Sequence, residues 1–385
     1  MFRICFSPIA GGDVLSGSER MTEKEQLIFE FIQKDPYISQ QELAETVGLS
    51  RPSVANIISG LIKKGHILGR AYILNDSQQI VCIGGANLDR KLQVKDKAQL
   101  GTSNPIESSK SVGGVARNIA ENLGRLGLDV TLLTACGTDS DWAFIEETSA
   151  LYMNLDQVSK IPGMATGSYT AVLDRDGELI IALADMEVYE EIKPEQLLKQ
   201  EALLSRARCM VADLNCPKET LQFLTQFANK HERPLVLIPV SSPKMNRLPD
   251  DLTGVDWMIT NRDESETYFN IKIETDQDWQ QAIKSWLSRG VQNVIITNGK
   301  NGAMIGNNEE GIFRIPAVPT QEIVDVTGAG DAFSSAVIFS WLDGKSLQDI
   351  AKAGAVNASK TLQSAYTVRQ DLTATQLLKD MEELS

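Results

Sequence analysis

The spacing of apolar residues changes along the chain, close to residue 79. Through residues 22–64, apolar side chains recur every three or four positions, which predicts short amphipathic helices. Beyond residue 79, continuous apolar runs typical of strands buried on both faces alternate with helical stretches. This alternation predicts an α/β domain with a mostly parallel sheet and helices on both sides. We expect strands at 80–85, 130–137, 209–214, 235–240, 257–260 and 294–299, and helices at 115–127, 140–152, 194–205, 217–231, 276–289, 329–343 and 346–365.

Two other segments, 166–174 and 178–184, show the strict alternation of half-exposed strands. They flank Arg175-Asp176-Gly177, which is typical of a hairpin turn. Together with residues 87–95 they predict a small second sheet that projects from the domain. Because ligands of parallel α/β sheets bind beyond the carboxyl ends of the strands, we expect this sheet to act as a lid.

The amino-terminal pattern predicts three helices, at 22–34, from 39 to a turn at Gly48, and from 50 to about 64. The first two begin with the Ser/Thr-x-x-Glu spacing of a capping box. Residues 66–74 have the pattern of a short strand pair. This succession resembles a winged helix-turn-helix domain, whose third helix enters the major groove of DNA. The alternative is a small three-helix domain that mediates dimerisation and has a solvated basic face.

The resemblance implies a DNA interface within residues 39–70. Polar side chains near the amino end of the third helix would face the bases, and basic side chains would lie near the phosphates. The first group is Arg51, Ser53 and Asn56, and the second is Lys63, Lys64 and Arg70. So few basic residues per copy bind DNA weakly, and a homodimer would therefore be required.

The same two regions differ in net charge. The chain of 385 residues has a formal net charge of −14. Residues 1–20 and 21–75 are each neutral, so the acidic excess lies after them. An acidic body argues against a protein that wraps nucleic acid, although residues 50–70 are basic without any acidic residue. We expect a disordered tail at 1–20, a DNA-binding-type domain at 21–75 and the α/β domain at 78–385.

Composition disfavours several classes of protein. No run approaches the ~20 apolar residues of a membrane-spanning helix, which argues against an integral membrane protein. Five scattered cysteines without a CxxC pair, and two histidines, indicate neither a disulfide framework nor a zinc site. We expect a cytoplasmic protein. Residues 1–20 lack the apolar stretch of a signal peptide, and Met21 is an alternative start.

The strongest chemical signal is the segment 325–333, DVTGAGDAF. Its small residues Gly328, Ala329 and Gly330 precede an apolar helix, whose amino-terminal N–H groups can bind an anion such as phosphate. Asp331 lies in the first turn, where a carboxylate beside phosphate is costly unless it accepts a proton from an attacking hydroxyl. The alternative is a glycine-rich turn in which the aspartate caps the helix.

A second glycine pair, Gly113-Gly114, precedes a helix that carries Asn118. This arrangement could hold a ligand hydroxyl, or it could be a close-packed loop. Asn261 and Glu264 follow another strand and are three residues apart on an emerging helix. They could point together towards hydrated Mg²⁺ and phosphates, or they could form a helix cap with solvated charges.

A fourth motif, TNGKNG at 297–302, ends a strand and turns into a hairpin. It could hold a nucleotide phosphate or be only a turn. The four motifs occur in order at strand ends of one sheet, and together the chain resembles the ribokinase-like sugar kinases of the phosphofructokinase-B family. The segments that carry the resemblance are GGVARNIAENLGRLG and DVTGAGDAF. The resemblance covers about residues 79–372, and the chain lacks the GxxxxGK[ST] motif of P-loop kinases.

The resemblance implies a three-layer α/β/α sandwich with a β lid, and it implies roles for individual residues. Asp331 would be the catalytic base, and Gly328, Ala329 and Gly330 would stabilise the transferring γ-phosphoryl group of ATP. The residues implied for ATP and Mg²⁺ are Asn261, Glu264, Thr297, Gly299, Gly302 and Asn357, the last beside the adenine. Those implied for sugar hydroxyls are Asn87, Asp89, Gly113, Gly114 and Asn118. Asp325 and Thr327 correspond to a monovalent-cation site, for K⁺.

Val115 replaces the lysine that ribokinases usually have after the glycine pair, which argues against free ribose. The segments TSNP at 102–105 and SYTAVLDRDGELIIALADM resemble pseudouridine kinases, which phosphorylate the 5′-hydroxyl of a C-nucleoside. Tyr169 and Asp185 would then face the base, or Asp185 could be a solvated strand end. We expect a pseudouridine kinase that is a homodimer in contact through the lid. The alternatives are a kinase for another ribonucleoside or sugar, and a regulator whose kinase fold only senses an effector.

Overall fold

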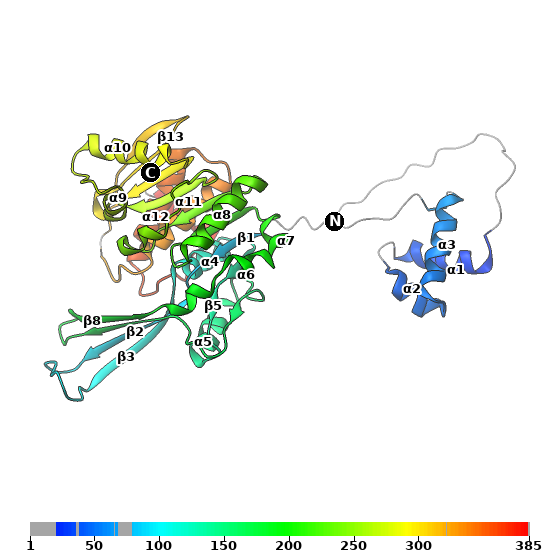
Figure 1. Cartoon of the computed structure of the whole chain (residues 1–385), viewed down its shortest axis with the longest axis horizontal. Helices are drawn as coiled ribbons and strands as arrows, with labels where there is room; N and C mark the ends of the chain where they lie inside the picture. Colours follow the sequence, from blue (N-terminus) through cyan, green and yellow to red (C-terminus); the bar gives the residue numbers. More distant parts are fainter. Residues whose placement is uncertain (1–20, 36–37, 65, 68–78, 321, 384–385) are drawn as a thin grey trace. The chain divides into compact units, whose positions relative to one another are not determined.

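The computed structural model describes residues 21–35, 38–64, 66–67, 79–320 and 322–383. The chain forms two compact units, and the division in the sequence falls between residues 76 and 77 (Figure 1). Residues 1–20, Arg70 and most of the strand pair expected at 66–74 lie outside the described residues. In the part of the chain that is described, no helix is long and apolar enough to cross a membrane.

The small unit contains three helices, as the apolar spacing predicted. They are α1 (Glu23–Lys34), α2 (Gln40–Val47) and α3 (Arg51–Lys63). The predicted capping boxes are present at Thr22 and at Ser39, where side chain and backbone exchange hydrogen bonds with the glutamate three residues on. Gly48 ends α2 in the left-handed conformation, with φ of 64°. Buried apolar residues from all three helices form one core: Ile28, Leu43, Ala44, Val54, Ile58 and Leu61.

An eight-stranded sheet in the order β14-β13-β12-β11-β10-β9-β1-β4 forms the centre of the large unit. The strands are β1 (Ile80–Ile83), β4 (Val130–Leu133), β9 (Cys209–Asp213), β10 (Leu235–Ile238), β11 (Trp257–Asn261), β12 (Asn293–Thr297), β13 (Ala303–Asn307) and β14 (Gly311–Ile315). The six parallel strands correspond to the six predicted apolar runs. The hairpin expected after the fourth motif is formed by the antiparallel strands β13 and β14, whose bounds were not predicted because polar residues and a glycine interrupt their apolar runs.

Helices cover both faces of this sheet, so the large unit has the predicted three layers. Alternate residues of β10 belong to different apolar cores, one on each face of the sheet. Leu235 and Leu237 belong to the core that contains residues of 218–231 and 276–288, and Val236 belongs to the core that contains residues of 115–125, 329–342 and 347–362. The helices are α4 (Val115–Arg125), α5 (Ser140–Ser149), α6 (Pro194–Leu198), α7 (Glu201–Leu204), α8 (Lys218–His231), α9 (Arg262–Phe269), α10 (Asp276–Ser288), α11 (Ala329–Leu342), α12 (Leu347–Leu362) and α13 (Ala374–Glu383). The single helix predicted at 194–205 is two short helices, α6 and α7.

A second sheet projects from the body of the large unit (Figure 1). Its order is β3-β2-β7-β8, with β2 (Asn87–Val94), β3 (Ile106–Gly113), β7 (Ser168–Leu173) and β8 (Leu179–Asp185). Three of these strands were predicted, but β3 was not, since its sequence IESSKSVG is largely polar and nearly all of it is exposed. We call this second sheet the lid.

Short elements complete the large unit. The strands β5 (Ala135–Cys136) and β6 (Ser159–Lys160) pair with each other, and the 3₁₀ helices are η1 (Glu187–Glu191), η2 (Ser242–Arg247) and η3 (Gly299–Asn301). The four cysteines within the described residues are free and buried.

Candidate active site

The two signature segments meet beyond the carboxyl ends of the parallel strands. Asn118 lies in the first turn of α4 and Asp331 in the first turn of α11. The Asn118 Nδ2 group donates a hydrogen bond of 2.8 Å to Asp331 Oδ2, although the two residues are 213 positions apart in the sequence. The glycine-rich segments at the starts of both helices are therefore brought to one place.

Asp331 has the protonation behaviour of a proton acceptor near neutral pH. The pKa of its carboxyl group is raised to about 7, mainly by burial and with a contribution from the nearby carboxylates of Asp213 and Asp89, against the opposing effect of the Asn118 hydrogen bond. The side chain does not cap α11, because the N-cap residue is Gly328 and no side-chain cap bond is present. The alternative of a capping aspartate is therefore not what the structure contains.

Gly328 is required by its surroundings. Its φ is +81°, and an added Cβ atom would lie 2.1 Å from the carbonyl oxygen of Thr367. Gly330, by contrast, has open space where a Cβ would be. The start of α11 is therefore held against Thr367 while the backbone at Gly330 stays accessible, which suits the binding of an anion by helix N–H groups.

The residues expected on the sugar side gather at the base of the lid. Asn87 Nδ2 donates to Asp89 Oδ1 at 2.6 Å, and burial raises the pKa of Asp89 to about 6. A Cβ on Gly113 would lie 2.2 Å from Asp89 Oδ2, and one on Gly114 would lie 2.4 Å from the carbonyl oxygen of Gly85. The glycine pair therefore forms a close-packed loop against Asp89 and Gly85, and Asn87 and Asp89, two residues apart on β2, share one face of the lid.

The lid register separates Tyr169 from Asp185. Tyr169 pairs with Asp89 on β2, so the two side chains share a face of the lid. Asp185 pairs with Ser168, whose partner on β2 is Leu88, and it therefore lies on the opposite face. The expectation that both residues face one base is corrected here: Asp185 is an exposed strand end, as the alternative stated.

Asp213 is a residue that the sequence analysis missed. It ends β9, is only 1% exposed, and accepts hydrogen bonds from the backbone N–H groups of Gly85, Ala116 and Asn215 and from the Asn215 side chain, at 2.8–3.0 Å. These bonds join the end of β1, the start of α4 and the segment after β9. The signal that could have revealed it is a charged residue at the end of an otherwise apolar strand.

The Asn261–Glu264 pair forms a capping box at the start of α9. Glu264 N donates to Asn261 Oδ1 at 2.9 Å, and Glu264 Oε2 accepts from Asn261 N at 2.9 Å and from Thr260 Oγ1 at 3.0 Å. Glu264 is 4% exposed, and burial raises its pKa. The pair is thus a helix cap, as the alternative stated, but its carboxylate is buried rather than solvated.

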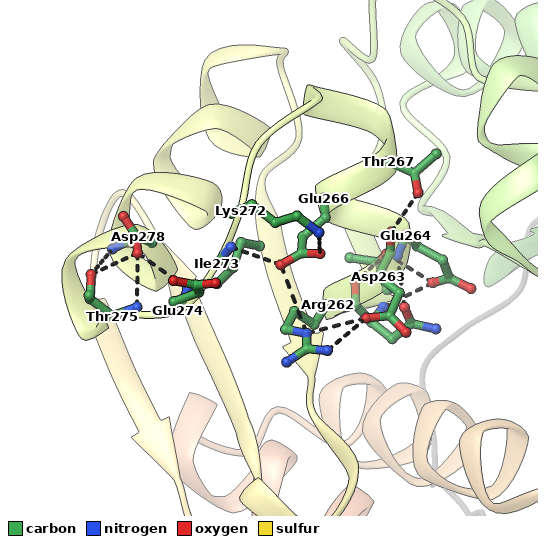
Figure 2. Close-up of polar contacts among 12 residues, drawn as sticks. Arg262, Asp263, Glu264, Glu266, Thr267, Lys272, Ile273, Glu274, Thr275 and Asp278 are labelled. Carbon is green, nitrogen blue, oxygen red and sulfur yellow. Dashed lines mark hydrogen bonds and ion pairs between the residues drawn. The ribbon is translucent and has the colours of Figure 1, made fainter.

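The neighbouring charged and polar side chains form ion pairs and helix caps with one another at the surface. Arg262 turns to Asp263 and Glu266, and Thr275 and Asp278 cap the next helix, α10 (Figure 2). In the described residues, no cluster of three or more acidic, histidine or cysteine side chains could hold a metal ion. Glu264, with its bonds concentrated on Oε2, remains the residue that fits an indirect role in Mg²⁺ binding through water.

A groove of about 650 Å³ adjoins the fourth motif. It is lined by residues 312–319 of β14 and the segment after it, and by Gln348, Lys352 and Ala355 of α12. Gly302 touches this lining, since an added Cβ would lie 2.1 Å from the carbonyl oxygen of Ile315. Thr297 Oγ1 donates to the carbonyl oxygen of Thr260 at 3.3 Å, and η3 contains Gly299.

Asn357 does not line the groove. It is fully buried, donates to the carbonyl oxygen of Ala332 at 2.8 Å and accepts from Arg369 Nε at 2.9 Å. The side chain therefore supports the first turn of α11 from inside the protein. The α12 residues that border the groove lie elsewhere on the helix, and the nearest to Asn357 in the sequence is Ala355.

Asp325 and Thr327 are bonded to each other and to the lid. Asp325 Oδ1 accepts from Thr327 N at 2.9 Å and from Thr327 Oγ1 at 2.7 Å, while Oδ2 pairs with Lys91 Nζ at 2.7 Å. These bonds bring the pKa of Asp325 down to about 2, although partial burial opposes them. The Lys91 ammonium is therefore the cation that pairs with Asp325 in this structure, and the K⁺ site stays a prediction.

In the small unit, the residues expected to read DNA lie mainly on the surface of α3. Arg51, Ser53, Asn56 and Lys63 are exposed. Lys64 instead forms an ion pair of 2.9 Å with Glu25 of α1, which ties α3 to α1. Arg70 lies outside the described residues.

Comparison with known proteins identifies both units. Residues 77–373 match the pfkB family of carbohydrate kinases, and residues 21–67 match a winged helix-turn-helix DNA-binding family. A sugar kinase of Escherichia coli described as uncharacterized, YeiI, is 30% identical over 86% of this chain and 91% of its own length. The pseudouridine kinase of Escherichia coli is 28% identical over 80% of this chain and 98% of its own length.

Solved structures agree on the fold. Arabidopsis thaliana ribokinase complexed with ribose and ATP has a TM-score of 0.70 at 20% identity, covering 80% of this chain and 99% of that one. A carbohydrate kinase from Agrobacterium tumefaciens has a TM-score of 0.68 at 27% identity, covering 80% and 98%. The chain therefore belongs to the pfkB carbohydrate kinase family, whose members are phosphotransferases with an alcohol group as acceptor, and it carries a winged helix-turn-helix domain at its amino end.

Proposed function

We propose that the large unit transfers the γ-phosphoryl group of ATP to the 5′-hydroxyl of a ribonucleoside, with pseudouridine as the favoured substrate. The observation that carries the proposal is the 2.8 Å hydrogen bond between Asn118 and Asp331 beside the Gly328–Gly330 segment. It joins the start of α4 to the start of the 14-residue helix α11, whose first turn carries the partly exposed carboxylate of near-neutral pKa. A proton acceptor beside an anion-binding helix end is what phosphoryl transfer to an alcohol requires.

In this proposal Asp331 accepts the proton of the attacking hydroxyl, while Asn118 holds the carboxylate in place. The N–H groups at Ala329 and Gly330 would bind the oxygens of the phosphoryl group as it moves. Asp213 contributes by keeping the Gly85 loop and the start of α4 together. Mg²⁺ would neutralise phosphate charge, and Glu264 is the residue that would orient its water ligands.

The groove between β14 and α12 is proposed as the adenosine site. Its size suits a nucleoside, and its lining from Ile312 to Pro319 is largely apolar, which favours a stacked base. Gly302 supports the assignment because it joins the groove to the segment that follows β12. A larger residue at 302 would force that segment away from the groove.

The choice of pseudouridine rests on Val115 in place of lysine and on the likeness to the Escherichia coli pseudouridine kinase. Other relatives are a ribokinase of Staphylococcus aureus and a guanosine-inosine kinase of Exiguobacterium acetylicum, so another ribonucleoside or a sugar is the second candidate. Tyr169, on the same lid face as Asp89, is proposed to contact the base.

The test is turnover of a panel of nucleosides and sugars with ATP and Mg²⁺, scored by ADP release and by the mass of the phosphorylated product. We expect pseudouridine to have the highest kcat/KM. Turnover of ribose or adenosine well above that of pseudouridine would reject the substrate, and turnover of none would favour a regulator that only senses an effector.

A second function, DNA binding by the small unit, is favoured by the exposed Arg51, Asn56 and Lys63 on α3 and by the family match of residues 21–67. The test is a salt titration of binding to promoter fragments, in which affinity should fall steeply with salt. The variant Lys63→Gln should bind more weakly and with a shallower salt dependence, whereas Lys24→Gln on α1 is the control. Absence of binding at low salt would leave dimerisation as the role of this unit.

A homodimer in contact through the lid is also proposed. The edge strand β8 is exposed throughout and carries Leu179, Ile180, Ile181 and Leu183, which are 42–56% exposed. A second copy of the lid could cover these side chains and pair with the open edge. Light scattering after gel filtration should give twice the chain mass of 42.2 kDa, and Ile181→Lys should reduce it to one chain. We also propose that the protein acts in the cytoplasm, where ATP is available and where cysteines stay reduced.

A further inference from the structure

Arg117 is an arginine in the interior of the large unit that the proposed reaction does not use. It belongs to the first turn of α4, immediately before Asn118, and is 1% exposed. Burial lowers the pKa of its guanidinium, and Glu121 one turn along the same helix opposes that shift. A buried cation of this kind is costly unless each of its donors has a partner.

The partners of Arg117 are specific. Its Nε donates to Ser149 Oγ, at the end of α5, at 3.0 Å, and its Nη1 donates to Asn118 Oδ1 at 3.2 Å. Its Nη2 forms an ion pair with Glu121 Oε2. Glu121 is shared, because its Oε1 accepts from Arg125 Nε at 2.8 Å. The guanidinium is therefore fixed from three sides, and one of its three contacts is the amide that reaches Asp331.

The chemistry of these groups determines which way the Asn118 amide points. A guanidinium has donors and no acceptor, so the amide must turn its oxygen towards Arg117 and its NH₂ group towards Asp331. The NH₂ group then donates to Asp331 Oδ2 at 2.8 Å, and this bond favours the ionised carboxylate because a charged oxygen is a stronger acceptor than the carbonyl oxygen of a carboxylic acid. If Arg117 were absent, the amide could rotate by half a turn and accept a hydrogen bond from a protonated Asp331.

We propose that Arg117 is a positioning residue, which orients the Asn118 amide so that Asp331 stays in its proton-accepting form. This inference rests on the proposed role of Asp331 as the base, and it goes beyond that role by naming what controls it.

Other charged groups also face Asp331 and must be considered in any pH dependence. Asp89 on β2 and Asp213 at the end of β9 raise the pKa of Asp331, whereas Arg117 and the Asn118 amide on α4 lower it. Arg117 also lowers the pKa of Asp89, so its removal raises the pKa of that group as well. For Asp331, the loss of the Arg117 charge and the loss of the oriented Asn118 amide both act to increase the pKa.

The experiment measures the pH dependence of kcat in Arg117→Lys and in Arg117→Met, which removes the buried cation and leaves Glu121 paired with Arg125. Lysine has a single donor atom and cannot reach Ser149, Asn118 and Glu121 together. In both we expect the acid-side pKa of kcat to rise by about one unit, with kcat at pH 7 reduced about fivefold and restored at high pH. The KM for ATP should not change.

The matched control is Arg125→Met. It removes the other arginine that pairs with Glu121, but Arg125 contacts Gln370 and Tyr152 rather than Asn118. Its acid-side pKa should equal that of the wild type. In an Asn118→Ala background Arg117→Lys, which keeps the positive charge, should no longer shift the pKa, because the amide that transmits the effect is gone. A purely structural arginine would instead lower stability and reduce kcat equally at every pH, and that result would overturn the inference.

The protonation of Asp331 can also be followed without turnover. The infrared carboxyl band that disappears in Asp331→Asn should titrate at higher pH in the Arg117 variants than in the wild type. Full turnover by Asp331→Asn would reject the base itself and with it the proposed mechanism. An inactive Asp331→Asn together with unshifted Arg117 variants would reject only the role of Arg117.

Discussion

The surroundings of Asp213 and of Asp331 differ, although both carboxylates lie beyond the carboxyl ends of the same sheet. Asp213 is 1% exposed and accepts four hydrogen bonds, three of them from backbone N–H groups. Asp331 is partly exposed and accepts one side-chain bond, from Asn118. Burial raises the pKa of both groups, but for Asp213 the bonds from Gly85, Asn215 and Ala116 all act in the opposite direction.

The difference teaches how one edge of a sheet can hold a structural and a reactive carboxylate. A carboxylate whose lone pairs are all used joins the loops around it and has no capacity left for a substrate. A carboxylate with a single donor keeps free lone pairs and a pKa near neutrality, so it can take up a proton during a reaction. The predictions below test this contrast.

The largest expected effect is on turnover in Asp331→Asn. Asparagine keeps the shape but cannot accept the proton, so kcat should fall by about 10³-fold. Steady-state kinetics with the best substrate of the panel measures this loss. Asp343→Asn, an exposed carboxylate at the other end of α11, is the control and should have wild-type kcat. A kcat within a factor of about three of the wild type in Asp331→Asn would contradict the contrast.

The next effect is on stability in Asp213→Asn. The amide would turn an NH₂ group towards backbone donors, leaving buried N–H groups without acceptors, and the free energy of unfolding should fall by about 3 kcal/mol. Urea unfolding followed by tryptophan fluorescence reports on the large unit alone, because all five tryptophans lie between residues 142 and 341.

The matched control for Asp213 is Asp251→Asn. Asp251 accepts a backbone bond from Thr253 at 2.9 Å on the protein surface. Its replacement should change the free energy of unfolding by no more than about 0.5 kcal/mol. Equal losses in the two variants would mean that the network around Asp213 has no special role.

A third prediction concerns pH. Because catalysis needs ionised Asp331, kcat should be constant above the pKa of about 7 and fall as pH decreases through it. Below that value the decrease should be about tenfold per pH unit. A profile of kcat from pH 5 to 9 measures it, with thermal unfolding at each pH to exclude loss of folded protein. A kcat that is flat from pH 5 to 9 would remove Asp331 from the role of base.

The smallest effect is a gain of stability in Asp331→Asn, opposite in sign to that of Asp213→Asn. The folded state raises the pKa of Asp331 from 3.8 to about 7, so the wild-type protein loses stability as pH rises between these values. The asparagine variant avoids this loss. We expect it to be more stable than the wild type at pH 8, by about 1 kcal/mol, and equal to it at pH 4. A loss of stability at pH 8 would show that Asp331 is structural like Asp213.

Much of the fold could be predicted because local patterns carried it. The six parallel strands are apolar runs, and the helices of the small unit begin with capping boxes whose bonds are local. Strand β3 could not be predicted, because its polar sequence IESSKSVG is a strand only through its pairing with β2. The break between α6 and α7 could not be predicted either, because the apolar spacing typical of one helix continues through it.

The candidate site likewise contains residues that could be predicted from the sequence and residues that could not. Its glycine segments and Asp331 were recognisable from the sequence, whereas the roles of Asn357 and Asp185 were not. Asn357 looked like a ligand contact but is buried beneath α11, and the face of Asp185 depends on the lid register. Asp213 and Arg117 were passed over, because a single charged residue in an apolar or helical segment has no local signature.

The sequence by itself determined the two-domain organisation that we expected, the alternating α/β pattern and the residues of the two glycine signatures, since periodicity and capping act between neighbours along the chain. Only the tertiary structure decided which of the buried charges meet. The bonds from Arg117 to Asn118 and from Asn118 to Asp331 join α4 to α11 across 213 positions of sequence. Whether a carboxylate becomes structural or reactive depends on how many donors the folded chain brings to it, and those donors come from segments that are distant in the sequence.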